Sequence, residues 1–223
     1  ILIFLIFSTL FCDYGGGYPG AILRTSTNAR EISLSNSLVS TYNIGFNAFA
    51  NPALISHLDE IEASSSLFSL PSKINMQVIS ISRNLPPKAG AGISFIRLGT
   101  NNLIGLNYSE QNTGSLDYSD SYVMMSFGLN FGKYLSLGVN GKALFQESSI
   151  SSTESIASNG TSFDVGLFSS PFNNLNLGLK IDNMFGKYNL DENNNIPRRI
   201  ISGVSYRPNN NMLILIQYEF IDL

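Results

Sequence analysis

Charged and amide side chains recur with a spacing of two in several segments of the second half of the chain, and these residues could form a polar site. They are Asn140, Lys142, Asp164, Lys180, Asp182, Gln217 and Glu219. Lysines and carboxylates on one surface either pair with one another or bind a polar solute. Paired carboxylates act as acid and base where a pocket shifts their pKa values, and the neighbouring sequence indicates no such pocket. We expect ion pairs that stabilise a wall, with a substrate-lining role as the alternative.

The other candidates for catalysis or metal binding lack partners in the sequence. His57 is the single histidine, and the sequence places no serine in a plausible catalytic arrangement with it. One histidine cannot build a metal site by itself. The acidic stretch 59–62 is expected at a solvated helix end and strand start. The glycines at 15–17 and 90–92 are not followed by the Lys-Ser/Thr of a phosphate-binding loop. We therefore predict no enzymatic activity, no catalytic residue, no metal and no cofactor.

The composition differs from that of an ordinary soluble domain. Only 13% of the residues are charged and 43% are hydrophobic, whereas ordinary domains have roughly 25% charged residues. The mean hydropathy is nevertheless only +0.10, because Asn, Ser and Gly stand where Lys and Glu are usual. A wall with lipid on one face and a polar interior on the other requires this mixture. The formal net charge of −3 argues against a nucleic-acid partner, which would require a clustered basic face.

Apolar and polar residues alternate through the segments that carry the polar side chains named above. The alternation is clearest in residues 123–131, 135–146, 162–167, 175–182 and 214–220. A period of two predicts β-strands with one apolar and one polar face. The polar side chains would then point into a lumen while the apolar ones meet lipid. Apolar groups occupy both faces of three less regular strands, at 74–83, 89–98 and 199–206. The inner faces of these strands would meet a plug, or the alternation is simply weaker there.

The connections between these segments alternate in length. Short ones are predicted at 84–88, 132–133, 170–174 and 208–211. Long polar ones are predicted at 109–121, 147–160 and 186–197. Outer-membrane barrels place short turns on the periplasmic side and long loops outside, whereas a soluble β-sandwich has no reason to alternate in this way. The sequence thus predicts an all-β protein, a transmembrane antiparallel up-and-down β-barrel.

Residues 1–17 are interpreted as the remnant of a secretory signal peptide. Their apolar run is shorter than the roughly 20 residues that a bilayer-spanning helix requires. The competing interpretation is a buried strand or helix. The single cysteine, Cys12, falls in this leader. Residues 18–223 are predicted to form the barrel domain, in which residues 18–58 are an N-terminal segment with a plug or a short helix.

Three motifs after the leader resemble those of a known family. They read Gly-Tyr-Pro-Gly-Ala-Ile-Leu-Arg at 17–24, Asn-Ala-Arg-Glu at 28–31 and Phe-Ala-Asn-Pro-Ala-Leu at 49–54. In order and spacing they resemble the N-terminal signature of the PorV/PorQ outer-membrane proteins, relatives of the FadL-type β-barrels. The matching positions are Gly20, Ala29, Arg30, Asn51, Pro52 and Ala53. The chain is similar to a divergent member, because the family's Gly, Ala and Gly are replaced by Asn28, Glu31 and Leu54.

The resemblance carries expectations about fold and function. It implies a barrel of about fourteen strands, of which nine or ten lie in this sequence and the C-terminal ones are missing. It also implies a bacterial outer-membrane location, lipid as a partner, and an N-terminal segment that plugs the lumen. The implied function is binding or transport of small hydrophobic compounds, or service as an accessory of type IX-like protein secretion with machinery subunits as partners. The alternative is an exported, non-catalytic structural or adhesive β-protein.

Overall fold

The structure is a computed structural model that describes residues 18–106, 112–132, 134–150, 154–189 and 195–222. The interpreted leader, with Cys12, lies outside the described residues. The described part begins with four short helical turns, η1 (Ala21–Arg24), α1 (Ala29–Ser33), α2 (Asn47–Ala50) and η2 (Pro52–His57). None of the described helices has the length and apolar character needed to cross a bilayer.

Nine strands follow these turns and form one antiparallel sheet, in which each strand pairs with its neighbours in the sequence. The prediction of an all-β, antiparallel, up-and-down arrangement is confirmed, and the strand number agrees with the nine or ten expected. A 3-10 turn, η3 (Pro71–Lys73), joins the first two strands. The strands are β1 (Glu62–Leu70), β2 (Ile74–Leu85), β3 (Ala89–Leu106), β4 (Asn112–Asn130), β5 (Ser136–Ile150), β6 (Glu154–Phe172), β7 (Leu175–Tyr188), β8 (Arg198–Asn209) and β9 (Met212–Asp222).

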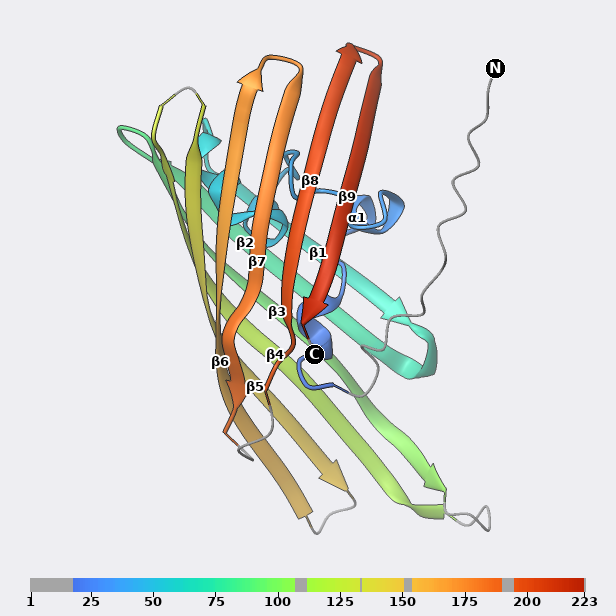
Figure 1. The fold of residues 1–223 in the computed structure, drawn as a ribbon. Helices are drawn as coiled ribbons and strands as arrows, with labels where there is room; N and C mark the ends of the chain where they lie inside the picture. Colours follow the sequence, from blue (N-terminus) through green and yellow to red (C-terminus); the bar gives the residue numbers. More distant parts are fainter. Residues whose placement is uncertain (1–17, 107–111, 133, 151–153, 190–194, 223) are drawn as a thin grey trace.

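The sheet is open. Its edges are β1 and β9, which do not pair with each other in the described part of the chain. Closing a barrel requires the first and last strands to share a ladder, so the described strands form a curved open sheet, and its completion into a barrel of about fourteen strands stays a prediction. The sheet curls around the helical turns of residues 18–58, with β7 to β9 in front of them and β2 to β4 behind (Figure 1).

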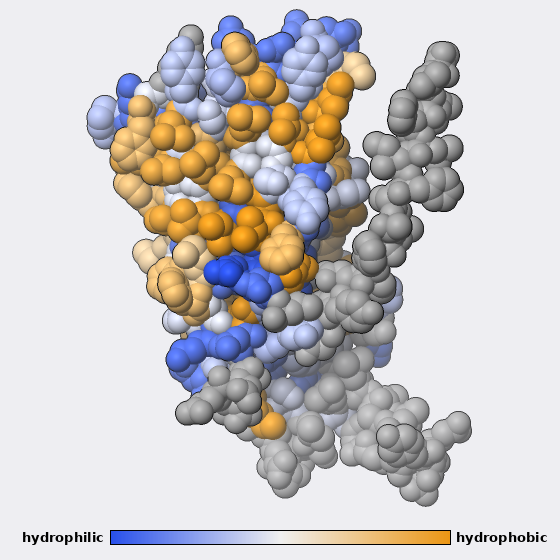
Figure 2. Space-filling view, viewed as in Figure 1, coloured by the Kyte–Doolittle hydropathy of each residue, from blue (hydrophilic) through white to orange (hydrophobic). Residues whose placement is uncertain are grey.

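The two faces of the sheet are inverted relative to a soluble β-protein. On the outer face apolar side chains are exposed, and on the inner face, which meets residues 18–58, polar side chains are buried. In β5, Val139 is 49% exposed and its neighbour Asn140 only 1%. In β6, Phe163 is exposed and Asp164 is fully buried. Figure 2 shows the outer face as a broad apolar region bordered by polar residues at the top and bottom of the view. The alternation predicted from the sequence is confirmed.

Two of the connections predicted to be long are largely strand. β4 begins at Asn112 and β5 continues to Ile150, so most of 109–121 and part of 147–160 belong to the sheet. β6 begins at Glu154 and takes in the remainder of 154–160. Polar residues predominate on both faces of these stretches, so hydropathy does not alternate regularly there, whereas the ladder of backbone hydrogen bonds continues. Residues 107–111, 151–153 and 190–194 lie outside the described part.

The less regular strands carry apolar residues on their inner face because that face packs against the N-terminal segment. Met76 and Val78 of β2 and Ile96 of β3 point inward, and they join a core cluster with Ile22 and Ile55. These side chains are almost fully buried. The inner face is therefore apolar where it meets the apolar side of residues 18–58, and polar over most of the remaining strands.

Glycines on the inner face give the N-terminal segment a place to lie. A row of directly paired glycines crosses four strands, from Gly90 through Gly128 and Gly138 to Gly166. A Cβ on Gly138 would lie 2.2 Å from the carbonyl carbon of Pro52, and one on Gly166 2.1 Å from Asn51 Oδ1. Only glycine permits such a close approach of two backbones. This glycine row fixes where η2 lies on the sheet.

Candidate functional site

The centre of the inner face holds an ion pair between β5 and β6. Lys142 Nζ lies 2.8 Å from Asp164 Oδ1, and the two side chains are 5% and 0% exposed. Asn140 donates from Nδ2 to Asp164 Oδ2 at 2.9 Å, and the backbone N–H of Asn183 donates to Oδ1 at 3.1 Å. Both oxygens of Asp164 therefore have donors, which a carboxylate needs in order to stay charged where water is excluded.

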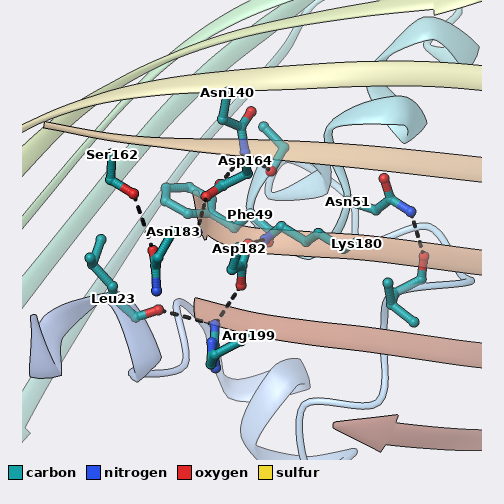
Figure 3. A network of polar contacts seen from close by, with 12 residues as sticks. Leu23, Phe49, Asn51, Asn140, Ser162, Asp164, Lys180, Asp182, Asn183 and Arg199 are labelled. Atoms are coloured by element: carbon teal, nitrogen blue, oxygen red, sulfur yellow. Dashed lines mark hydrogen bonds and ion pairs between the residues drawn. The ribbon is translucent and has the colours of Figure 1, made fainter. Parts of the chain in front are cut away.

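A second group of charges joins β7, β8 and β9, and Figure 3 shows its members on β7 and β8. Asp182 lies 2.8 Å from Lys180 Nζ and 2.6 Å from Arg199 Nη2. Arg199 also contacts Glu219 across the next ladder, at 3.1 Å. Asp182 is buried, whereas Glu219 at the sheet edge is one-third exposed. The two groups together carry three cations and three carboxylates, so these two groups balance in charge.

Inner-face side chains also hold the N-terminal segment by donating to its backbone. Lys180 Nζ donates to Phe49 O at 2.6 Å, and Asn140 Nδ2 to Ala48 O at 3.0 Å. These carbonyl groups belong to the short helix α2, which leaves most of its carbonyls without intrahelical partners. Bonds of the same kind run from Arg199 to Leu23, from Ser205 to Ser40 and from Gln217 to Asn36.

The polar residues singled out in the sequence all lie on this inner face. Five of them are buried, namely Asn140, Lys142, Asp164, Lys180 and Asp182. Gln217 and Glu219 stand on the edge strand β9 and are more accessible. Gln217 is nevertheless engaged with the N-terminal segment, because its Oε1 accepts from Val39 N at 3.2 Å. The structure thus brings the seven onto one surface, in two ion-pair groups and their amide neighbours.

Sequence reasoning missed two members of this network, Arg199 and Asn183. Arg199 belongs to a basic pair too short to interpret alone, and its partners come from strands on either side of β8. Asn183 follows Asp182 directly, so strict alternation would place it on the outer face. A bulge in the β6–β7 ladder and a positive φ of 61° let it remain on the inner face. The sequence feature that could have indicated this departure is the asparagine directly after Asp182, since Asn adopts a positive φ more readily than most residues.

The Asn-Ala-Arg-Glu motif at 28–31 is held by its own polar groups. Asn28 caps α1 by accepting from Glu31 N at 3.0 Å. The Glu31 carboxylate accepts from the N–H of Thr27 at 2.5 Å, its Oγ1 at 2.8 Å and Asn43 Nδ2 at 3.1 Å. Burial raises the pKa of Glu31, and these hydrogen bonds oppose that shift. The matched positions Ala29 and Arg30 form the first turn of this helix.

The Phe-Ala-Asn-Pro-Ala-Leu motif at 49–54 makes the tighter connection to the sheet. Asn51 Nδ2 donates to Val39 O at 2.9 Å and to Leu167 O of β6 at 3.0 Å. Its Oδ1 accepts from Ala53 N at 3.1 Å, and Pro52 takes the first position of η2. One side chain therefore caps a helix and joins two distant segments. Among the other matched positions, Gly20 has a φ of 72° just before η1.

A cavity of about 70 Å³ remains between residues 18–58 and the inner face. Its polar lining includes Glu31, Lys142, Asp182 and Arg199. Sites for small organic ligands measure roughly 300–1,000 Å³, so this space suits a few ordered waters rather than a ligand of that size. Within the described part of the chain, no group of three His, Cys, Asp or Glu side chains is placed to hold a metal ion.

Comparison with known proteins adds no family to this description. No protein-family model matches the chain, and a search of curated proteins found no match.

Proposed function

We propose that this protein is a non-catalytic, integral outer-membrane β-barrel protein, with β1 to β9 as part of the wall and residues 18–58 inside it. The observation that carries the proposal is the inversion of the two faces, with apolar side chains exposed and ion pairs buried. Soluble monomers rarely expose contiguous apolar areas above a few hundred Å². A lipid environment removes the cost of this surface, and a polar interior accommodates the charges.

The height of the apolar surface agrees with a membrane span. On β5 the outward residues from Leu137 to Phe145 are apolar or small, and the next outward residues are Glu147 and Ser149. At about 3.4 Å per residue and a tilt of about 40°, this stretch covers roughly 21 Å along the membrane normal. Barrels carry an apolar band of about 25 Å. The polar ends of β4, β5 and β6 would then project beyond the bilayer. They lie on the side of the connections predicted to be long, which we propose is the extracellular side.

Of the two roles implied by the PorV/PorQ resemblance, the small cavity favours the secretion accessory. Passage of a hydrophobic compound through this part of the molecule would require the N-terminal segment to leave the inner face. That face holds the segment by hydrogen bonds from Lys180, Asn140 and Gln217 and by the glycine row. An accessory that presents its outer and extracellular surfaces to secretion subunits requires no such displacement.

The membrane assignment can be tested with purified protein. Folded outer-membrane barrels resist SDS until boiled, because their ladders stay intact. We expect unboiled samples to migrate differently from boiled ones, and the protein to remain in the detergent phase. Equal migration in both states, together with full solubility in detergent-free buffer, would favour the exported adhesive protein instead.

The role can be tested separately in cells. A deletion strain is compared with its parent for uptake of a labelled long-chain fatty acid and for secretion of cargo. We expect a secretion defect with unchanged uptake, and crosslinking of the protein to secretion subunits. Reduced uptake with normal secretion would support the transporter role and would leave the membrane proposal intact.

A further inference from the structure

A groove on the outer face of β2 and β3 lies just beyond the apolar surface. Its volume is about 360 Å³, and Lys73, Asn75, Gln77, Arg97 and Gly99 line it. In the ladder Asn75 pairs with Gly99 and Gln77 with Arg97. Gly99 has no side chain, which leaves space on the sheet surface beside Asn75 and Arg97. This groove lies at the end of the sheet that is proposed to face outward.

Among the described residues that line it, the groove carries positive charge without a compensating acid. Lys73 and Arg97 line it, and no carboxylate does. Among the described residues neither cation forms a salt bridge, whereas Arg198, Arg199, Lys142 and Lys180 all do. Arg97 donates from Nε to Ser119 Oγ at 3.2 Å, which orients the guanidinium on the sheet surface. The amides of Asn75 and Gln77 add neutral donors to the same space.

The position of the groove relative to the apolar surface identifies its ligand. Two residues further along β2 from Gln77, the same face carries Ile79, which is 49% exposed. Two residues along a strand span about 7 Å. The side chains of Gln77 and of its partner Arg97 therefore lie about 7 Å outside the last apolar residue of the proposed membrane span. Phosphates of lipid headgroups lie at this depth, and both Lys and Arg bind phosphate oxygens through charge-assisted hydrogen bonds.

We propose that Lys73 and Arg97 bind the phosphate of an anionic lipid headgroup in the outer leaflet, with Asn75 and Gln77 as additional donors. This inference rests on the proposed membrane function. The ligand class is a phosphorylated lipid, held by its acyl chains against Ile79 and its neighbours and by its phosphate in the groove.

The test uses folded protein in phosphatidylcholine nanodiscs with a small fraction of diphosphoryl lipid A. Native mass spectrometry measures how much lipid A stays bound. The variant is Lys73→Gln/Arg97→Gln, and the matched control is Arg83→Gln/Lys88→Gln, which removes equal charge from exposed positions at the opposite end of β2. At about 1 kcal/mol for each interfacial cation, we expect the variant to bind roughly thirty-fold more weakly. The control should change by less than about three-fold.

Three results would overturn the inference. Equal losses in the variant and the control would show an unspecific charge effect. No loss in the variant would show that lipid A binds elsewhere. Inorganic pyrophosphate that displaces lipid A as effectively as added lipid would assign the groove to a soluble phosphate. Heat-dependent migration is recorded for each sample, because protein that never inserts contradicts the membrane proposal, whereas inserted protein without lipid preference contradicts only this inference.

Discussion

Lys142 Nζ and Asp164 Oδ1 lie 2.8 Å apart on adjacent strands, and the pair is buried between the sheet and the N-terminal segment. Asn140 connects the pair to that segment, because its amide donates both to Asp164 and to the carbonyl of Ala48. The ion pair, the amide and the backbone of α2 thus form one continuous set of contacts. A change to either charge is expected to affect the sheet and the segment together.

Asp164→Asn should destabilise the protein strongly. The substitution leaves Lys142 as an uncompensated buried charge, which typically costs about 3–5 kcal/mol. Urea unfolding in lipid vesicles measures the loss in the free energy of unfolding. The control is Lys187→Met, on the exposed side of β7. Its free energy of unfolding should lie within about 0.5 kcal/mol of the parent's. Lys142→Met/Asp164→Leu should recover much of the loss, because it removes both charges. A large fall in uptake or secretion without a fall in stability would instead assign the pair to a substrate.

Gly138→Ala should displace the N-terminal segment. The new Cβ would lie 2.2 Å from the carbonyl carbon of Pro52, so either η2 or the strand must move. Forced overpacking of this kind usually costs about 1–3 kcal/mol. We expect faster tryptic cleavage after Arg24 and Arg30 in native protein. Gly141→Ala is the control, since its Cβ would point to the outer face with its nearest neighbour, Phe163, at 3.7 Å. Equal cleavage rates in the two variants would contradict the steric role of the glycine row.

The arrangement of the strands could be predicted from residues such as Val139, Asn140, Phe163 and Asp164, because a β-strand turns successive side chains to opposite faces. Their alternation requires no knowledge of neighbouring strands. The ion pairs could not be predicted in the same way, since pairing depends on register. Lys142 pairs with Ser162 in the ladder, and its charge partner Asp164 is diagonal to it.

The parts that sequence reasoning missed depend on local departures from regular strand. Asn183 stays on the inner face through a bulge, and the polar ends of β4 and β5 continue the ladder without alternating hydropathy. The place of η2 also depends on a row of glycines that are far apart in the sequence and adjacent only after folding. Cross-strand register sets all three features, and local composition does not encode it.

Val139→Arg distinguishes the membrane protein from the soluble alternative. Val139 is half exposed within the apolar surface of β5, one outward position from its centre at Gly141, and a cation facing lipid near the midplane costs about 2–4 kcal/mol. Asn159→Arg, on the exposed polar part of β6, should cost at most about 1 kcal/mol. The free energy of folding into phosphatidylcholine vesicles is the measurement. If Val139→Arg instead folds normally and increases solubility in buffer, the outer face is exposed to water and the barrel proposal fails.

His57 should make the docking of the N-terminal segment sensitive to pH. Its Nε2 lies 2.6 Å from Ser136 Oγ at the start of β5, and its ring packs edge-on against Phe168, with centroids 5.3 Å apart. Burial lowers the pKa of His57 below its ordinary value of 6.5, so the folded protein binds this proton less readily than the unfolded chain. Stability from neutral His57 is therefore complete above pH 6.5 and declines as the pH falls through that value toward the folded pKa.

His57→Gln isolates this contribution, because glutamine can still bond to Ser136 but does not titrate. The free energy of unfolding is measured for the parent and the variant at neutral and mildly acidic pH. The parent should lose more stability on acidification than the variant, since the carboxylates titrate alike in both. Tryptic cleavage at Arg24 and Arg30 should increase in parallel, because the histidine lies at the end of η2, which holds the segment on the glycine row. Parallel pH profiles for the two proteins would mean that His57 is protonated as easily in the folded state as in the unfolded chain, which would contradict the proposed pH dependence of docking.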